Sequence, residues 1–177
     1  MNGLGVTANH VTVAAMGLSL ATGAALAFFP GHPKLLLAVP GVLFARMALN
    51  AIDGMLAREF GHQSDLGALL NELGDVISDA GLYLPLAFWP GFTPWLVVGI
   101  VVLAIISEMT GVLAQTLGSP RGYAGPMGKS DRAFLFSVIC TILGCGTPPG
   151  MWIEGFLLPA FLLLIATILN RGRQALK

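Results

Sequence analysis

Long apolar stretches separated by short polar breaks dominate the pattern of this chain. Six of them approach the ~20 residues that a helix needs to cross a bilayer. They run from about His10 to Phe29, Lys34 to Phe60, Ser64 to Trp89, Thr93 to Leu117, Ser130 to Gly146 and Gly150 to Asn170. Pro-Gly or Pro-Pro pairs follow the first, third and fifth stretches, where a helix should end. We therefore predict an all-α polytopic membrane protein with six transmembrane helices, forming a single domain over residues 1–177.

The composition supports a lipid environment. Hydrophobic residues make up 55% of the chain and charged residues only 10%. A soluble domain usually carries about 25% charged residues, so this chain has too little charge to cover a surface in water. The formal net charge is zero, and without a surplus of basic residues we expect no nucleic-acid partner.

The distribution of basic residues predicts the orientation. With six spans, both termini and the loops after the even-numbered spans lie on one side of the membrane. The opposite side carries Lys34 alone, whereas this side carries seven basic residues: Arg58, Arg121, Lys129, Arg132, Arg171, Arg173 and Lys177. Because cytoplasmic loops are the ones enriched in Lys and Arg, we predict cytoplasmic termini and location in a bacterial inner membrane.

Polar residues recur at helical spacing inside the second and third stretches, although a charge within a span costs roughly 2.5–3.5 kcal/mol. A short loop joins these two helices, so their polar stripes can face each other in the cytoplasmic half of the membrane. Acids gathered there would repel one another unless some are neutral or a cation binds. Oxygen ligands suit Mg²⁺, Mn²⁺ or Ca²⁺, and the alternative is a set of hydrogen bonds to Arg46 that only packs the helices. The stripes are Arg46, Asn50, Asp53 and Ala57, spaced four, three and four apart, and Asn71, Asp75 and Asp79, spaced four apart.

From Asn50 to Asp75 the chain reads N-x-x-D-G-x-x-A-R-x8-G-x3-N-x3-D. This pattern resembles the signature of the CDP-alcohol phosphotransferase family, D-x-x-D-G-x-x-A-R-x8-G-x3-D-x3-D. Every spacing is preserved, and six of the eight defined positions match. Asn50 and Asn71 stand where the family's first and third aspartates are expected. Six spans, with the signature across the second and third, also fit the family architecture.

The resemblance implies a specific reaction. A phosphatidyl or related substituted-phosphate group would pass from a CDP-linked lipid, commonly CDP-diacylglycerol, to an alcohol, with release of CMP, in phospholipid biosynthesis. It also implies a homodimer and a cytoplasm-facing cavity with one or two divalent metals, Mg²⁺ or Mn²⁺, which together with Arg58 would neutralise the pyrophosphate. Asp75 would be the general base. The metal ligands would come from Asn50, Asp53, Asn71, Asp75 and Asp79, and the nucleotide would lie against Asn50, Asp53, Gly54, Ala57, Arg58 and Gly67.

The two asparagines leave the metal content open. An amide oxygen can bind Mg²⁺ or Ca²⁺ but adds no charge. Either metal affinity is weak, or one ion suffices, or nearby Glu72 and Asp79 act as substitutes. The segment 75–79 resembles the phosphatidylinositol-phosphate synthase branch of the family, although Val76 stands where that branch has a basic residue.

Further candidates lie outside the signature. Arg121, Lys129 and Arg132 belong to a glycine-rich basic loop that resembles the G-x-x-G-K stretch of many family members, and they could hold a phosphate of the acceptor or of the lipid. The alternative is an ordinary solvated cytoplasmic loop. Glu108 lies in the middle of a span and needs a partner; it could reach Arg46 or line the acceptor pocket.

Two other functions compete with the transferase. The asparagines favour a non-catalytic relative that binds a CDP-lipid without transfer. A small ion or proton transporter could use the buried acids as a relay, although the outer half of every span is apolar.

Overall fold

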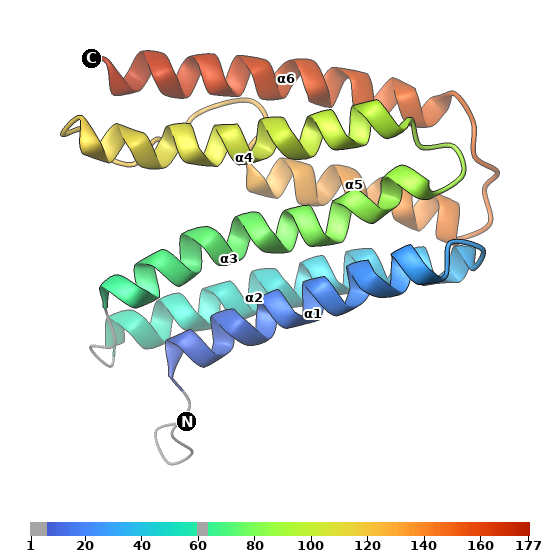
Figure 1. Cartoon of the computed structure of the whole chain (residues 1–177), viewed down its shortest axis with the longest axis horizontal. Helices are drawn as coiled ribbons and strands as arrows, with labels where there is room; N and C mark the ends of the chain where they lie inside the picture. Colours follow the sequence, from blue (N-terminus) through green and yellow to red (C-terminus); the bar gives the residue numbers. More distant parts are fainter. Residues whose placement is uncertain (1–6, 60–63) are drawn as a thin grey trace.

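A computed structural model describes residues 7–59 and 64–177, with the backbone alone for residues 56–59. These residues form helices and loops without any strand, which confirms the all-α prediction. α1 begins and α6 ends at the same end of an elongated bundle (Figure 1). The helices are α1 (Ala8–Phe28), α2 (Ala38–Glu59), α3 (Asp65–Tyr83), α4 (Pro94–Thr116), α5 (Lys129–Gly144) and α6 (Trp152–Ala175), and two short 3₁₀ helices, η2 (Pro33–Leu37) and η3 (Leu84–Phe88), precede α2 and follow α3.

Prolines and caps set the helix ends. The third stretch was expected to be one helix from Ser64 to Trp89, but α3 ends at Tyr83 and the chain continues as η3. Pro85 explains the break, because proline has no N–H to continue the α-helical bonding. At the other end of α3, the Ser64 hydroxyl accepts a 3.0 Å hydrogen bond from the Gly67 N–H, which is a regular N-cap.

The helices pack in two groups. α1 lies against both α2 and α3, α4 pairs with α6, and α5 packs on α2. The crossing of α1 and α3 depends on glycine: a Cβ on Gly23 would lie 1.9 Å from the carbonyl oxygen of Gly81. Such close backbone approach is typical of helix pairs in membranes.

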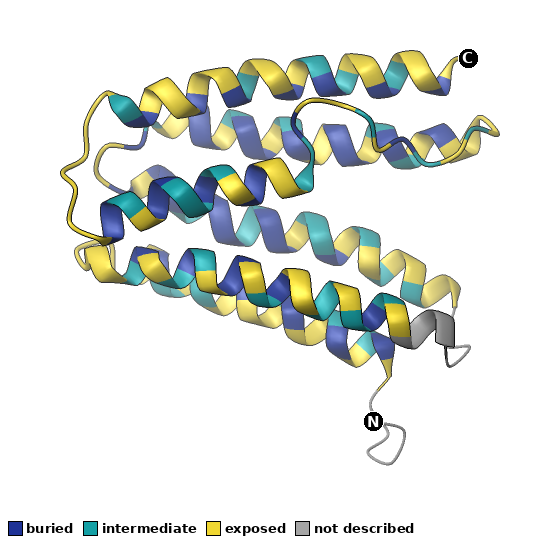
Figure 2. Cartoon of the chain, turned by 180° about the vertical axis from the view of Figure 1, so that it is seen from behind, coloured by how far each residue is buried: buried dark blue, intermediate teal, exposed yellow. Residues whose placement is uncertain are grey.

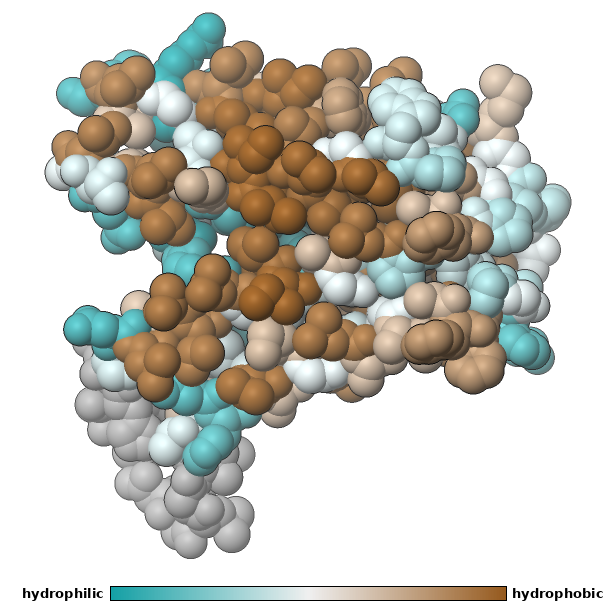
Figure 3. All heavy atoms as spheres, viewed as in Figure 1, coloured by the Kyte–Doolittle hydropathy of each residue, from teal (hydrophilic) through white to brown (hydrophobic). Residues whose placement is uncertain are grey.

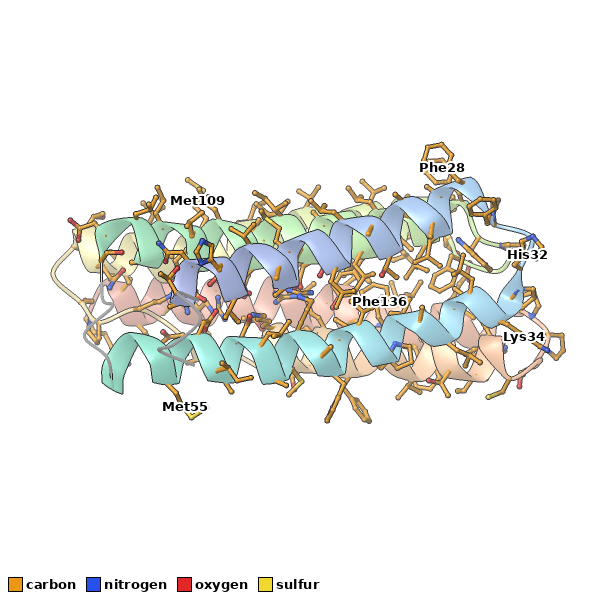
Figure 4. The ribbon with its side chains drawn as sticks, turned by 90° about the horizontal axis from the view of Figure 1, so that it is seen from below. Phe28, His32, Lys34, Met55, Met109 and Phe136 are labelled. Atoms are coloured by element: carbon orange, nitrogen blue, oxygen red, sulfur yellow. The ribbon has the colours of Figure 1, made fainter. Side chains whose placement is uncertain are left out.

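Apolar side chains fill the bundle and also cover its outside. Each helix turns its buried face inward and its exposed face outward (Figure 2), and Phe136 lies between the helices and stacks on Tyr83 at 4.2 Å between ring centroids (Figure 4). Large apolar residues also point away from the bundle, and Phe44 and Phe134 are 75% and 73% exposed. An apolar exterior of this kind is suited to lipid.

Four segments in the described part are long and apolar enough to cross a membrane: α1, α4, α6 and Pro33–Met55, which joins η2 to most of α2. α3 carries several acids, and α5 has only 16 residues, about 24 Å at 1.5 Å per residue. That α3 and α5 also cross, as the six-span topology requires, stays a prediction.

Candidate active site

Two polar pockets open near the end of the bundle where α6 ends. Figure 3 shows a hollow at this end, edged by hydrophilic residues. The pocket that we call the glycine pocket has a volume of about 420 Å³ and lies among α1, α2 and α3. Its lining consists of Ala8, Asn9, Thr12, Asn50, Asp53, Gly54, Ser64, Gly67, Ala68 and Asn71.

The second pocket, which we call the ion-pair pocket, has a volume of about 450 Å³. It adjoins the glycine pocket, because Asn50 and Asn71 line both. Its lining consists of Asn50, Asn71, Glu72, Asp75, Glu108, Arg121, Tyr123, Gly128, Lys129, Ser130, Asp131 and Arg171. Residues far apart in sequence therefore meet here, from α2 through to α6.

The polar stripes of α2 and α3 face each other. The Asn50 amide donates a 3.1 Å hydrogen bond to Asp75 Oδ1, and Arg46 forms a 2.9 Å ion pair with Asp79. The helical spacing predicts that these polar residues share one face of each helix, and α1, which packs on both α2 and α3, helps to hold the two faces in position. α1 adds a residue that the sequence did not single out: the Thr12 hydroxyl donates a 2.8 Å hydrogen bond to Asp53 Oδ2.

Glu108 is at the centre of a network of ion pairs. Its carboxylate lies 3.1 Å from Arg132, 3.2 Å from Arg171 and 3.3 Å from Arg121. The sequence suggested Arg46 as a partner, but Arg46 instead pairs with Asp79 and lies 3.9 Å from Asp75. Basic residues of α5, α6 and the loop between α4 and α5 therefore pair with this mid-span acid of α4, as a buried charge requires.

The remaining acids in this region also have basic partners. Arg132 bridges Glu108 and Asp79, at 3.2 Å from the latter, Arg121 lies 2.5 Å from Glu72, and Lys129 contacts Asp75. Figure 4 shows side chains bearing nitrogen and oxygen gathered between the helices in this half of the bundle. The repulsion expected among the acids is therefore offset largely by cations of the chain itself.

Arg121 lies in the loop between α4 and α5 and stays charged. Burial disfavours its charged form, yet its contacts with Tyr123 and Glu72 raise the pKa of the guanidinium above its usual value. The guanidinium also lies 4.5 Å from the centroid of the Tyr123 ring, within the range of a cation–π interaction.

The structure brings many of the predicted site residues together, with some differences in surroundings. Gly54, Gly67 and Asp53 line the glycine pocket. Asp79 directs both carboxylate oxygens at arginines, and Arg132, only 2% exposed, lies behind the ion-pair pocket and not in its lining. The side chains of Ala57 and Arg58 lie outside the described residues.

Arg171 and Thr12 are two residues of this region whose role in the packing was not predicted from the sequence. Arg171 was counted only among the positive charges of the cytoplasmic side, yet it is 2% exposed and donates a 2.7 Å hydrogen bond to the Ser107 carbonyl. Its spacing of four from buried Thr167 and Ala175 was a signal that it lies on the inner face of α6.

The donor set fits one divalent cation better than two. In the part of the chain that the structure describes, no group of three or more His, Cys, Asp or Glu is arranged to hold a metal ion. The two pockets nevertheless contribute the carboxylates of Asp53 and Asp75 and the amides of Asn50 and Asn71. These are the hard oxygen donors that Mg²⁺ and Mn²⁺ prefer. Two carboxylates would balance the charge of a single ion once Lys129 released Asp75.

Residues 5–170 match the sequence profile of the CDP-alcohol phosphatidyltransferase family, and the chain belongs to this family. It is 48% identical over 171 residues to the inner membrane protein YnbA of Escherichia coli K12, which covers 97% of this chain and 85% of that protein. It is 27% identical over 151 residues to the phosphatidylinositol phosphate synthase of Corynebacterium glutamicum, which covers 82% of this chain and 67% of that one. Together with the four apolar segments, the first relative indicates an integral membrane protein.

Solved structures share the fold. The phosphatidylinositol phosphate synthase of Mycobacterium tuberculosis with CDP-DAG bound superposes with a TM-score of 0.78 at 21% identity, covering 97% of this chain and 87% of that one. The same enzyme in complex with manganese and citrate gives a TM-score of 0.79 at 22% identity, covering 98% and 84%.

Proposed function

We propose that this protein transfers the phosphatidyl group of CDP-diacylglycerol to a small alcohol and releases CMP, as a step in phospholipid synthesis. The observation that carries the proposal is the junction of the two pockets. Asp53 lies in one and Asp75 in the other, and Asn50 and Asn71 line both. A group-transfer enzyme needs such adjoining sites, because it must hold donor and acceptor in reacting geometry.

The glycine pocket suits the nucleotide end of the donor. A Cβ on Gly67 would lie 3.0 Å from the Asn9 side chain, so glycine keeps this wall open and lets a ligand approach the backbone. The similar fold from Mycobacterium tuberculosis was solved with CDP-DAG bound. We assign Asn50, Asp53, Gly54, Ala57, Arg58 and Gly67 to the nucleotide.

Asp75 is the general base in this proposal. Its carboxylate is oriented by the Asn50 amide and contacts Lys129. It takes the proton of the acceptor hydroxyl, and the hydroxyl oxygen attacks the phosphorus that carries diacylglycerol. The bond from that phosphorus to the oxygen of CMP breaks, and CMP leaves with the electron pair.

One divalent cation, Mg²⁺ or Mn²⁺, fits the donors at the junction, and a fold relative was solved with manganese. Asp53 and Asp75, with the amides of Asn50 and Asn71, would hold it, and when bound it supplies positive charge against the pyrophosphate. We remove Asp79 from the predicted ligands, because Arg46 and Arg132 already engage its carboxylate. It positions α2, α3 and α5 instead.

The proposal includes the membrane arrangement. Six spans would place both termini and both pockets on the cytoplasmic side, where CDP-linked lipids and water-soluble alcohols can meet. The near-absence of basic residues at the other end, where Lys34 lies (Figure 4), supports this orientation. A homodimer is part of the same proposal.

A non-catalytic relative is the second candidate. The observation that favours it is the charge lost at Asn50 and Asn71, together with the absence of a three-residue metal cluster among the described side chains. Such a protein would bind CDP or CDP-diacylglycerol and release no CMP. A transporter, the third possibility, would show ion flux in proteoliposomes without nucleotide.

The deciding experiment uses the purified full-length protein with labelled CDP-diacylglycerol, Mg²⁺ or Mn²⁺ and a panel of alcohols. We expect CMP release that depends on both the cation and one class of alcohol, with a new lipid product identified by mass spectrometry. Tight CDP binding without CMP release on any alcohol would support the non-catalytic reading instead.

A further inference from the structure

Lys129 is held less firmly than the arginines that pair with the acids of this region. The side chains of those four arginines are between 2% and 17% exposed. The Lys129 side chain is 34% exposed, and Asp75 is its one acidic partner in the part of the chain that the structure describes. The ion pair between Lys129 and Asp75 is therefore the one that solvent reaches most easily.

The chemistry of the side chain points the same way. A lysine ammonium is a compact charge on a flexible stem, whereas an arginine guanidinium binds through several N–H groups in a fixed plane. Arg132 bridges Asp79 and Glu108, so its departure would break two ion pairs at once. The departure of Lys129 would break one, and Arg46 would still lie 3.9 Å from Asp75. Asp75 is therefore the acid whose contacting cation is the easiest to replace.

Lys129 also has space into which it can move. It lines the ion-pair pocket, and it lines a side pocket of about 190 Å³ that lies between α2 and α5 and includes Leu43 and Met47 of α2. A rotation of the long side chain can carry the ammonium from Asp75 into either space. No helix has to move for this rotation, because Lys129 lies at the very start of α5.

Asp75 is also the acid to which the proposed cation must bind. Asp53, the other carboxylate of the junction, accepts a hydrogen bond from Thr12 and has no basic partner among the residues that line its pocket. Asp75 Oδ1 already accepts from the Asn50 amide and contacts Lys129. Two cations side by side on that oxygen would repel each other strongly, so a divalent ion and the ammonium compete for it.

We propose that Lys129 and the divalent cation exchange places on Asp75. This inference rests on the proposed function, because it uses the metal site at the junction of the two pockets. Lys129 pairs with Asp75 until the ion arrives, and it then moves into the ion-pair pocket or the side pocket while the carboxylate turns to the metal. Lys129 is thus a positioning residue that keeps the proposed base paired until the cation is bound.

Chemical labelling of lysines tests the exchange directly in the wild-type protein. The chain has three lysines, Lys34, Lys129 and Lys177. Lys34 and Lys177 are exposed, and Lys34 lies at the opposite end of the bundle (Figure 4), so both serve as internal references. In a short pulse of acetic anhydride read by mass spectrometry, saturating Mn²⁺ should raise the labelling of Lys129 by about fivefold, the release of a half-exposed ion pair. Labelling of the two references should stay constant. Mn²⁺ that binds without changing the labelling of Lys129 would overturn the exchange.

Substitutions of Lys129 give a second readout that needs no turnover. Lys129→Met removes the competing cation, so the Kd for Mn²⁺, measured by electron paramagnetic resonance of the free ion, should fall by about fivefold. Lys129→Arg keeps the charge and should not lower the Kd. Lys34→Met, the matched control at the other end of the bundle, should leave the Kd unchanged. If the contact with Asp75 only joins α3 to α5, Lys129→Met will lower the stability of the protein and leave the Kd as it is, and this result would overturn the exchange.

The failure of the exchange and the failure of the proposed function have different signatures. CMP release that depends on Mn²⁺, together with constant labelling of Lys129, would overturn the exchange and leave the transferase proposal intact. Labelling of Lys129 that rises with Mn²⁺, without CMP release on any alcohol, would support the exchange and overturn the transferase proposal.

Discussion

The two pockets differ most in how they carry charge. Among its described lining residues, the glycine pocket contains one charged side chain, Asp53, beside amides, hydroxyls and glycines. The ion-pair pocket has a similar volume but is lined by acids and bases that pair with one another. Both share Asn50 and Asn71, so the contrast arises on the two sides of one wall.

This difference suits the two pockets to ligands of different charge. In the glycine pocket the charge of Asp53 has no basic partner among the lining residues. A cation can therefore bind there, and the cation can in turn attract a pyrophosphate. Paired charges in the ion-pair pocket instead hold their side chains in fixed positions around the space that a ligand would enter.

Removing the carboxylate of Asp75, the proposed general base, should nearly abolish transfer but leave both pockets able to bind their ligands. Asp75→Asn keeps the shape of the side chain but removes its ability to accept a proton, so we expect CMP release to fall by about 10²–10⁴-fold. CDP binding, measured by titration, should persist. Asp65→Asn, an exposed acid in the first turn of the same helix, should retain wild-type turnover. Full activity in Asp75→Asn would refute the base assignment.

Breaking the ion-pair network should lower the free energy of unfolding more than it affects the transfer reaction itself. Arg132→Met removes one cation from Asp79 and from Glu108. Both acids keep other arginine partners, so we expect a loss of about 1.5–3 kcal/mol, the value of a hydrogen bond to a charged group. Denaturant unfolding in detergent should show a loss of this size. Arg173→Met, which removes an exposed charge from α6, should change stability little. Equal losses in the two variants would show that the network does not stabilise the pocket.

The signature region could be predicted because its geometry is local. A period of 3.6 residues puts Asn50 and Asp53, or Asn71 and Asp75, on one face, and the short connection turns the two faces toward each other. The Asn50 amide donates to Asp75 as these two facts predict, although α1, which packs on both helices, also holds them in this arrangement. The break after Tyr83 was equally local, and Pro85 carried the signal that was missed.

Contacts between distant helices could not be predicted in the same way. Arg171 and Glu108 are 63 residues apart, and their spacing says nothing about whether α4 and α6 adjoin. In the sequence, nothing distinguishes Thr12 from any other threonine of an apolar helix. It reaches Asp53 because α1 packs on α2. The buried acids indicated that basic partners were needed. Which basic residues pair with them depends on the tertiary packing of the helices.

Placing an acid at the wall that the two pockets share should sharpen the contrast between them. Asn71→Asp adds a carboxylate between the pocket of Asp53 and that of Asp75, so we expect Mn²⁺ affinity to rise by about tenfold, or about 1.4 kcal/mol. Electron paramagnetic resonance of free Mn²⁺ measures this directly. Asn170→Asp makes the same change at an exposed position near the end of α6 and should leave the Kd unchanged. Unaltered Mn²⁺ affinity in Asn71→Asp would contradict a metal site at the junction.

The smallest effect should fall on the glycine pocket alone. Thr12→Val keeps the side-chain shape but removes the 2.8 Å hydrogen bond to Asp53, a loss of about 1 kcal/mol. If Asp53 serves the donor, KM for CDP-diacylglycerol should rise by roughly fivefold, while KM for the alcohol stays unchanged because Thr12 does not line the ion-pair pocket. Thr22→Val, which removes a hydroxyl bonded to the Leu18 carbonyl in the same helix, should alter neither value. Equal changes in both KM values for Thr12→Val would mean that the two pockets do not act as separate donor and acceptor sites.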